Sequence, residues 1–237
     1  LPLHIRWKVI KDIFPGEFNQ FYTDRLIPAL KQSGRHPHAQ SLTRFVRVLE
    51  HQRLPDDRFL TSLVHFIDSL PFDSPKDCYE VGNLLEALLK RVTQSGGKVS
   101  GEYTTPDIVA ELMVELVDPQ PEDRVYDPCF GTGGVLLKCA ERMHTRAKQM
   151  PPRVWDQVRR RSIFGFELCS TPYVVGFTRL VLAGIDMPGL ELGNTLERAD
   201  LSNHSASQFD CILADPPFGV RVSPEIQSHF HIKSIPR

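Results

Sequence analysis

Hydrophobic residues recur at every third or fourth position through the first 95 residues of the chain, which is the period of an amphipathic helix. One such set lies within residues 42–49 and a second within residues 59–67. Turn sequences rich in Gly, Pro, Asp and Ser interrupt the pattern, for example at 33–37 and 71–75. We therefore expect a helical region at the start of the chain, with a last helix over residues 76–94.

After a predicted hinge at Ser95-Gly96-Gly97, short apolar runs alternate with segments of helical periodicity. This alternation predicts an α/β fold with a parallel sheet covered by helices. The chain would thus consist of an α-helical amino-terminal domain, residues 1–97, and a second domain, residues 98–237. Strands are expected at 125–127, 162–167, 190–193 and 211–214, and helices at 105–117, 135–143 and 171–182.

The composition restricts the class of protein but adds little to this pattern. Hydrophobic residues make up 41% and charged residues 24% of the 237-residue chain, as in ordinary soluble proteins, and the net charge of -1 neither favours nor excludes a nucleic-acid partner. No apolar run approaches the roughly 20 residues that span a bilayer, so no membrane association is expected. The five cysteines form no CxxC pair, which favours reduced thiols in a cytoplasmic protein and argues against a zinc site.

The segment Arg124–Val135, with the sequence RVYDPCFGTGGV, predicts a ligand-binding turn between a strand and a helix. Asp127 would end the strand at the edge where open α/β sheets bind ligands, and the following helix would direct its free N–H groups to the same place. Gly131, Gly133 and Gly134 would let a ligand approach the backbone closely. Glycine turns also occur for purely structural reasons, but this spacing is neither that of a Walker loop nor that of the full dinucleotide motif.

Two later segments could contact the same ligand. Glu167 ends the second predicted strand about forty residues after the glycines, where a carboxylate could accept both ribose hydroxyls of an adenosine moiety. A surface glutamate is the alternative. Asn194, Thr195 and Leu196 follow the third predicted strand and could offer an amide to an adenine edge.

A group of polar side chains precedes the helix predicted at 105–117. Glu102, Tyr103 and Thr104 provide an acid, an aromatic ring and a hydroxyl, which an amino-acid-like ligand would use. Thr105 is a good N-cap and Pro106 suits the first helical position, so a plain capped helix start is the simpler interpretation of this segment taken alone.

The most specific stretch is Asp215-Pro216-Pro217-Phe218, at the end of the fourth predicted strand. The two prolines donate no backbone N–H and make the turn rigid. Asp215 and the Pro216 carbonyl could accept the two protons of a planar amino group, and Phe218 could stack on the ring that bears it. A strand end with an ordinary proline turn is the alternative, but the two upstream acids and the glycine turn favour the functional interpretation.

GEYTTP, DPCFGTGG, the strand ending at Glu167 and DPPF, in this order, resemble the adenine-specific DNA amino-methyltransferases, specifically the modification (M) subunits of type I restriction-modification systems. The resemblance extends from about Asp77 to Gly219. It implies a Rossmann-like S-adenosylmethionine-dependent methyltransferase fold, methyl transfer to the exocyclic amino group of adenine in double-stranded DNA, and no metal. Many type I relatives have Asn at the first position of DPPF, whereas the Asp215 of this chain is common in the wider adenine class.

The resemblance also implies a role for each motif. Glu167 would bind the ribose of S-adenosyl-L-methionine. The residues implied to line the rest of the cofactor site are Glu102, Tyr103, Thr104, Thr105, Pro106 and Asp107, together with Thr132, Gly133 and Gly134. The implied catalytic tetrad is Asp215, Pro216, Pro217 and Phe218.

A complete domain of this fold has seven strands, of which this chain would provide the first four. We therefore expect the rest of the sheet and the target recognition to come from a missing carboxyl-terminal region or from a specificity subunit. Two other functions stay open from the sequence: a protein glutamine methyltransferase, since a side-chain amide is also a planar amine, and a non-catalytic cofactor-binding assembly subunit. GEYTTP argues for DNA over protein as the substrate.

Overall fold

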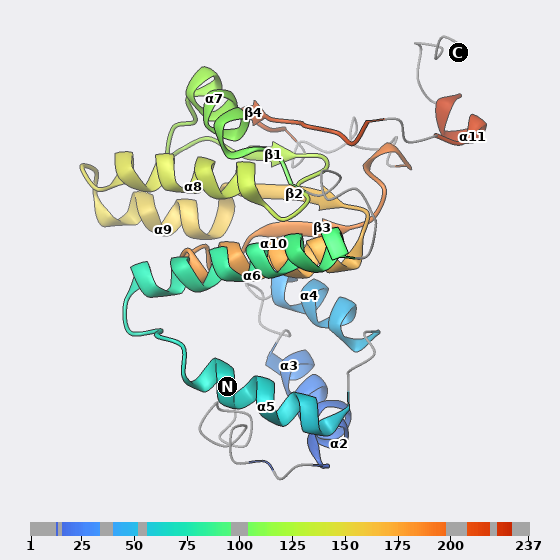
Figure 1. The fold of residues 1–237 in the computed structure, drawn as a ribbon. Helices are drawn as coiled ribbons and strands as arrows, with labels where there is room; N and C mark the ends of the chain where they lie inside the picture. The colour runs from blue at the N-terminus through green and yellow to red at the C-terminus, as the bar shows by residue number, and fades with distance from the viewer. Residues whose placement is uncertain are drawn as a thin grey trace.

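The computed structural model of the protein describes residues 13, 16–33, 40–51, 56–95, 104–197, 208–218 and 222–228. Its centre is a sheet of four parallel strands in the order β3-β2-β1-β4 (Figure 1). The strands are β1, Val125–Asp127, β2, Ile163–Glu167, β3, Gly189–Leu192, and β4, Cys211–Ile212. The α/β fold with a parallel sheet that the sequence predicts is confirmed.

The order of the strands creates a reversal between β1 and β4. The chain moves outward from β1 to β2 and β3, and then crosses back to pair β4 with the other side of β1. Val125 consequently pairs with Ile163 of β2 on one side and with Cys211 of β4 on the other. In open α/β sheets a crevice forms at the carboxyl ends of the strands at such a reversal, and ligands bind there.

Helices that follow the strands cover one face of the sheet. They are α8, Gly134–Ala147, α9, Pro152–Arg161, and α10, Ser170–Leu182. Right-handed crossovers bring α8 and α10 to the same side, where they pack against each other. Leu136 and Met143 of α8 and Leu180 of α10 are completely buried in the resulting core.

The helix before β1 is α7, Asp107–Val117. It begins two residues later than predicted, because Pro106 has an extended ψ of 138° and occupies the N-cap position instead of the first helical position. The side-chain cap expected from Thr105 is therefore not formed. Asp118 ends the helix in a left-handed conformation with φ of 52°.

The described residues before position 96 are mostly helical, as predicted. Its elements are α2, Phe18–Phe21, the π-helical turn η2, Tyr22–Leu26, α3, Ile27–Ser33, α4, Gln40–Glu50, α5, Asp57–Asp68, and α6, Pro75–Ser95. Figure 1 shows α2, α3 and α5 at the bottom of the molecule, while α4 and α6 lie against the layer that contains α10. No helix within the described ranges is long and apolar enough to cross a membrane.

Two of these early helices share the core of the sheet domain. Phe45 of α4 stacks on Phe177 of α10 with 4.2 Å between the ring centroids, and Tyr79 of α6 packs against the same cluster. The boundary between residues 97 and 98 stays a prediction, but α4 and α6 lie before it and pack against α10.

Candidate active site

Three acidic residues lie near the ends of the strands around the reversal. Asp127 is the last residue of β1, Glu167 is the last residue of β2, and Asp215 follows β4 after a two-residue extension. Asp127 is only 3% exposed, and burial raises its pKa from 3.8 to about 7, with smaller contributions from the charges of Glu167 and Asp215. The charges of Glu167 and Asp215 therefore both act on Asp127 at this edge of the sheet.

Glu167 connects β2 to the turn that follows β1. Its Oε2 accepts the backbone N–H of Gly131 at 2.9 Å, and its Oε1 accepts the N–H of Cys169 at 2.7 Å. Burial raises the pKa of this carboxyl, whereas the backbone hydrogen bonds lower it. The Leu168 backbone also bonds this carboxylate, so about one of its roughly four lone-pair sites is left for a further donor.

The glycine turn adopts the conformations for which glycine is needed. Gly131 and Gly133 have φ of 55° and 77°, in the left-handed region that residues with a side chain rarely adopt. A Cβ at Gly133 would lie 3.3 Å from the Cα of Gly176, so this glycine allows α10 to approach the turn. A Cβ at Gly134, the first residue of α8, would meet no atom within 4 Å. Of these two glycines, Gly134 is the one that leaves open space beside the turn.

Thr132 lies between these glycines, but its side chain is directed into the protein. The residue is 1% exposed, and its hydroxyl donates to Glu86 Oε1 at 3.2 Å. Its contact with a ligand, implied by the sequence resemblance, stays a prediction, and the side-chain hydroxyl is already used in the interior.

Ion pairs between α7 and α8 show how the two helices are aligned, and therefore where the start of α7 lies. The pairs are Lys138 with Glu111, Arg142 with Glu115 and Arg146 with Asp118. In each pair the residue of α8 follows its partner by 27 or 28 positions, so the two helices run parallel and in register. The same offset brings Asp107 beside Gly134, and the segment Thr104–Asp107 therefore starts α7 at the same end as the glycine turn.

The segment after β3 folds into a short 3-10 helix, η4, Thr195–Glu197. Asn194 caps it, because its Oδ1 accepts the N–H of Leu196 at 3.1 Å and its Nδ2 donates to Glu197 Oε1 at 3.1 Å. The Thr195 hydroxyl contacts the Tyr126 hydroxyl of β1 at 2.9 Å. Asn194, Thr195 and Leu196 are all partly exposed next to the end of β3.

The DPPF segment leaves the sheet directly after β4. Leu213 is buried, and its N–H still donates to the Tyr126 carbonyl at 3.0 Å, which fixes the exit of the chain. Asp215 is half-buried, Pro216 and Pro217 are exposed, and Phe218 is 94% exposed. An almost fully exposed Phe next to a half-buried acid offers a flat apolar surface to a ligand ring.

Two residues near this edge were not singled out from the sequence as functional. The Cys129 thiol interacts with the backbone of Asp215, so it links the glycine turn to DPPF, and burial raises the pKa of this thiol to about 12. Leu168, which follows Glu167, is 62% exposed. The position of Leu168, an apolar residue directly after the acid that ends β2, could have indicated it from the sequence. No local pattern indicated that Cys129 contacts Asp215.

The structure does not test every residue that the sequence indicated. Glu102 and Tyr103 lie outside the described residues, whereas Thr104 and Thr105 are half-buried and Pro106 and Asp107 are exposed. Among the described residues, no group of three or more His, Cys, Asp or Glu side chains is arranged to bind a metal ion.

Comparison with known proteins gives consistent matches. A family model described as N-6 DNA Methylase matches residues 76–235, more than half of the chain. The EcoEI type I restriction enzyme methylase subunit of Escherichia coli is 28% identical over 172 residues, covering 72% of this chain and 34% of that protein. The StySPI type I restriction enzyme methylase subunit of Salmonella potsdam is 26% identical over 247 residues, covering 97% of this chain and 44% of that protein. The chain thus spans less than half the length of these relatives.

A solved structure shows that the similarity extends to the fold. It comes from work on complex assembly and conformational transition of the type I R-M system, and it matches with a TM-score of 0.75 and 29% identity. The match covers 99% of this chain and 47% of that chain, so it includes the early helices as well as the sheet.

Proposed function

This chain belongs to the N-6 DNA methylase family, and from that premise we propose that it is the cofactor-binding and adenine-binding part of a type I modification methyltransferase. The reaction is methyl transfer from S-adenosyl-L-methionine to the exocyclic amino group of adenine in double-stranded DNA. The observation that carries the proposal is the convergence of the glycine turn, Glu167 and Asp215 at the edge where β1, β2 and β4 end.

The residues at this edge fit S-adenosylmethionine. Glu167 is a buried carboxylate that can accept about one more hydrogen bond beside its three from the backbone, and a ribose hydroxyl would offset part of its desolvation. The space beside Gly134 and the N–H groups of the first turn of α8 suit the part of the cofactor closest to the turn. Asn194 and Leu196 lie at the end of β3, where an adenine ring would follow the ribose.

The start of α7 suits the amino-acid end of the cofactor. The register of the ion pairs between α7 and α8 brings Thr104–Asp107 to the end of α8 that carries the glycine turn. The hydroxyls of Thr104 and Thr105 and the carboxylate of Asp107 are groups that bind an ammonium or a carboxylate. Glu102 and Tyr103 would extend this group of side chains.

When bound, S-adenosylmethionine would supply a methyl group on a positively charged sulfur, so the adenine nitrogen could attack the methyl carbon directly, with a neutral thioether as the leaving group. Asp215 and the Pro216 carbonyl would each accept one proton of the amino group, which directs the nitrogen lone pair toward the methyl carbon. As the new N–C bond forms and the S–C bond breaks, positive charge develops on the nitrogen. The Asp215 carboxylate would stabilise that charge, and the proton that leaves the nitrogen would pass to solvent.

Phe218 provides the surface for the target base. An adenine inside a duplex is out of reach of this edge, so it must leave the stack at a cost of a few kcal/mol. The 94% exposed ring of Phe218 can stack on the extruded base and recover part of that cost. Pro216 and Pro217 limit the motion of the ring relative to Asp215.

We assign recognition of a DNA sequence to a specificity subunit. The relatives named above are subunits of type I restriction enzymes. No observation on the described residues favours a glutamine side chain as the acceptor, or a purely structural role for the cofactor site.

The test is methyl transfer by the full-length protein together with its specificity subunit. Labelled S-adenosylmethionine is supplied with unmodified double-stranded DNA, and the DNA is then digested to nucleosides. We expect the label in N6-methyladenine. Label that enters protein but not DNA would refute the proposal and support a protein substrate, and the absence of cofactor binding would refute the cofactor site itself.

A further inference from the structure

The glycine turn is supported from its buried side by residues that lie outside all the sequence motifs. The Thr132 carbonyl accepts a hydrogen bond from Arg179 Nη1 at 2.9 Å, and the Thr132 hydroxyl donates to Glu86 Oε1 at 3.2 Å. Arg179 belongs to α10, and Glu86 belongs to α6, 46 positions before Thr132. The turn between β1 and α8 is thus connected to a helix of the amino-terminal region.

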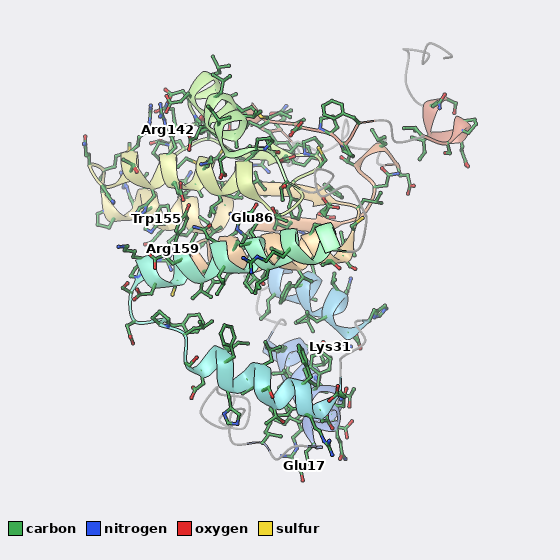
Figure 2. All side chains as sticks on the ribbon, viewed as in Figure 1. Glu17, Lys31, Glu86, Arg142, Trp155 and Arg159 are labelled. Carbon is green, nitrogen blue, oxygen red and sulfur yellow. The ribbon has the colours of Figure 1, made fainter. Side chains whose placement is uncertain are left out.

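Glu86 and Arg179 also form an ion pair with each other. Arg179 Nη2 lies 3.0 Å from Glu86 Oε2, and the two side chains are 5% and 14% exposed, respectively. The same nitrogen donates to Asn83 Oδ1 of α6 at 3.3 Å. Because loss of either partner would leave a buried charge uncompensated, the two side chains are confined to this arrangement. In Figure 2, Glu86 lies on the side of α6 that is turned toward the sheet domain.

Close backbone contacts leave the turn little room to move independently of α6. A Cβ at Gly133 would lie 3.3 Å from Gly176 of α10, and a Cβ at Gly82 of α6 would lie 3.5 Å from Arg179 Cγ. The turn therefore packs on α10 at Gly176, and α6 packs on α10 one helical turn later, at Arg179. Because protein interiors are close-packed and contain few voids, a movement of α6 would also move α10 and the glycine turn.

We propose that Glu86 is a positioning residue for the cofactor turn, which acts through Thr132 and Arg179 without touching the cofactor. The inference rests on the proposed function, because it requires that the glycine turn binds S-adenosylmethionine. Its consequence is that α6, a helix of the amino-terminal region, sets the affinity for the cofactor. The turn is fixed from both sides, by Glu167 at Gly131 and by Glu86 at Thr132.

The test measures S-adenosylmethionine binding by calorimetry in the full-length protein with its specificity subunit. Glu86→Ala removes both contacts, whereas Glu86→Gln keeps the volume and an acceptor for Thr132 but loses the ion pair. We expect Glu86→Ala to weaken cofactor binding about tenfold and Glu86→Gln to weaken it less. The KM for the cofactor should rise, while kcat at saturating cofactor and the affinity for DNA stay close to the wild-type values.

Two further variants separate positioning from a general loss of structure. Thr132→Val removes the hydroxyl that Glu86 binds, so the losses in the double variant with Glu86→Ala should be less than additive, because the two variants share the Thr132–Glu86 hydrogen bond. Glu80→Gln is the matched control, since Glu80 lies on the same helix with a side chain 61% exposed. It should bind the cofactor like the wild type.

The outcomes distinguish this inference from the proposed function. Wild-type cofactor affinity in both Glu86 variants, or strictly additive losses in the double variant with Thr132→Val, would overturn the positioning role and leave the methyltransferase proposal intact. A wild-type protein that does not bind S-adenosylmethionine would overturn both. If Glu86→Ala does not fold, Glu86→Gln and Thr132→Val decide the question.

Discussion

The Glu167 carboxylate accepts the backbone N–H of Gly131 at 2.9 Å, so the last residue of β2 and the turn after β1 form one unit although 36 positions separate them. The other carboxylate oxygen accepts the N–H of Cys169. The Leu168 backbone also bonds this carboxylate, so three of its roughly four lone-pair sites serve the backbone and about one is left for a ribose hydroxyl. Glu167 therefore shapes the turn, and its contact with the cofactor stays a prediction.

Substitution of Glu167 by Ala should weaken S-adenosylmethionine binding by about 1 to 3 kcal/mol, because a ribose hydroxyl and the backbone N–H groups lose a charged acceptor. Calorimetry in the full-length protein measures this loss, with Glu122→Ala, an exposed glutamate in the turn before β1, as the control. Intact cofactor affinity combined with reduced turnover would show that the ribose assignment is wrong.

The raised pKa of Asp127 predicts a pH dependence of stability. Burial raises this pKa from 3.8 to about 7, so the folded protein holds a proton that the unfolded chain releases near pH 4. The contribution of this proton to stability is fully present below pH 3.8 and is lost as the pH rises to about 7. The difference between the two pKa values corresponds to about 4 kcal/mol as an upper bound.

Asp127→Asn removes this titration and keeps an oxygen that can accept the Cys129 N–H. The free energy of unfolding, measured by urea titration between pH 4 and pH 8, should therefore increase for the variant relative to the wild type as the pH rises. The difference should level off above pH 7. Parallel profiles for the two proteins would contradict a buried, protonated Asp127.

Gly133 and Gly134 should respond differently to a methyl group. Gly133→Ala combines a left-handed φ of 77° with a contact of 3.3 Å to Gly176, so it should lower the stability by about 1 to 3 kcal/mol. The side chain of Gly134→Ala meets no protein atom within 4 Å, so it should leave the melting temperature unchanged or raise it.

The two variants should rank in the opposite order for cofactor affinity, with the larger loss in Gly134→Ala. The methyl group of Gly134→Ala would enter the space proposed for S-adenosylmethionine and weaken its binding by about 1 to 3 kcal/mol. Thermal unfolding and calorimetry on the same samples separate the two effects. Unchanged cofactor binding in Gly134→Ala would exclude the open side of this glycine as the ligand side.

The sheet could be predicted because its strands are short apolar runs followed by residues that end a strand, such as proline. β1 is buried at each of its three positions and then meets Pro128, so its sequence indicates both a strand and its end. β4 ends two residues earlier than predicted, at Ile212, although the apolar run continues and the Leu213 N–H still donates to the Tyr126 carbonyl. An apolar pattern indicates which residues are buried, but it does not indicate where the hydrogen bonding between neighbouring strands ends.

Other features were missed because local patterns specify them weakly or not at all. α9 was missed because it has only three apolar residues besides its proline, Val154, Trp155 and Val158, and although these lie on one helical face, such a short pattern was not recognised. The direction of the Thr132 hydroxyl depends on Glu86, which lies 46 positions away in another helix. Such a contact is decided by how α6 packs on α10, and the spacing of glycines in the turn cannot show it.

Asp215 is the residue on which the proposed chemistry depends most. It is half-buried beside Asp127, at the end of a different strand from the glycine turn, so its loss should spare the contacts made to the cofactor. Phe218 is nearly fully exposed and would act on the base instead. Phe218→Ala should therefore mainly weaken capture of the extruded adenine, and a mismatched target, which is easier to extrude, should partly restore the rate.

Asp215→Ala, in the full-length protein with its specificity subunit, should reduce adenine methylation at least about a hundredfold, because it removes an acceptor that acts on the developing charge at nitrogen. Binding of S-adenosylmethionine should change little, since that contact forms in the transition state and not with the cofactor alone. Asp215→Asn is the matched control: its amide oxygen can still accept one amine proton, so it should retain much more activity than Asp215→Ala. The assay is methyl transfer to unmodified DNA beside a cofactor titration, and an Asp215→Ala protein that methylates at the wild-type rate would exclude this residue from the reaction.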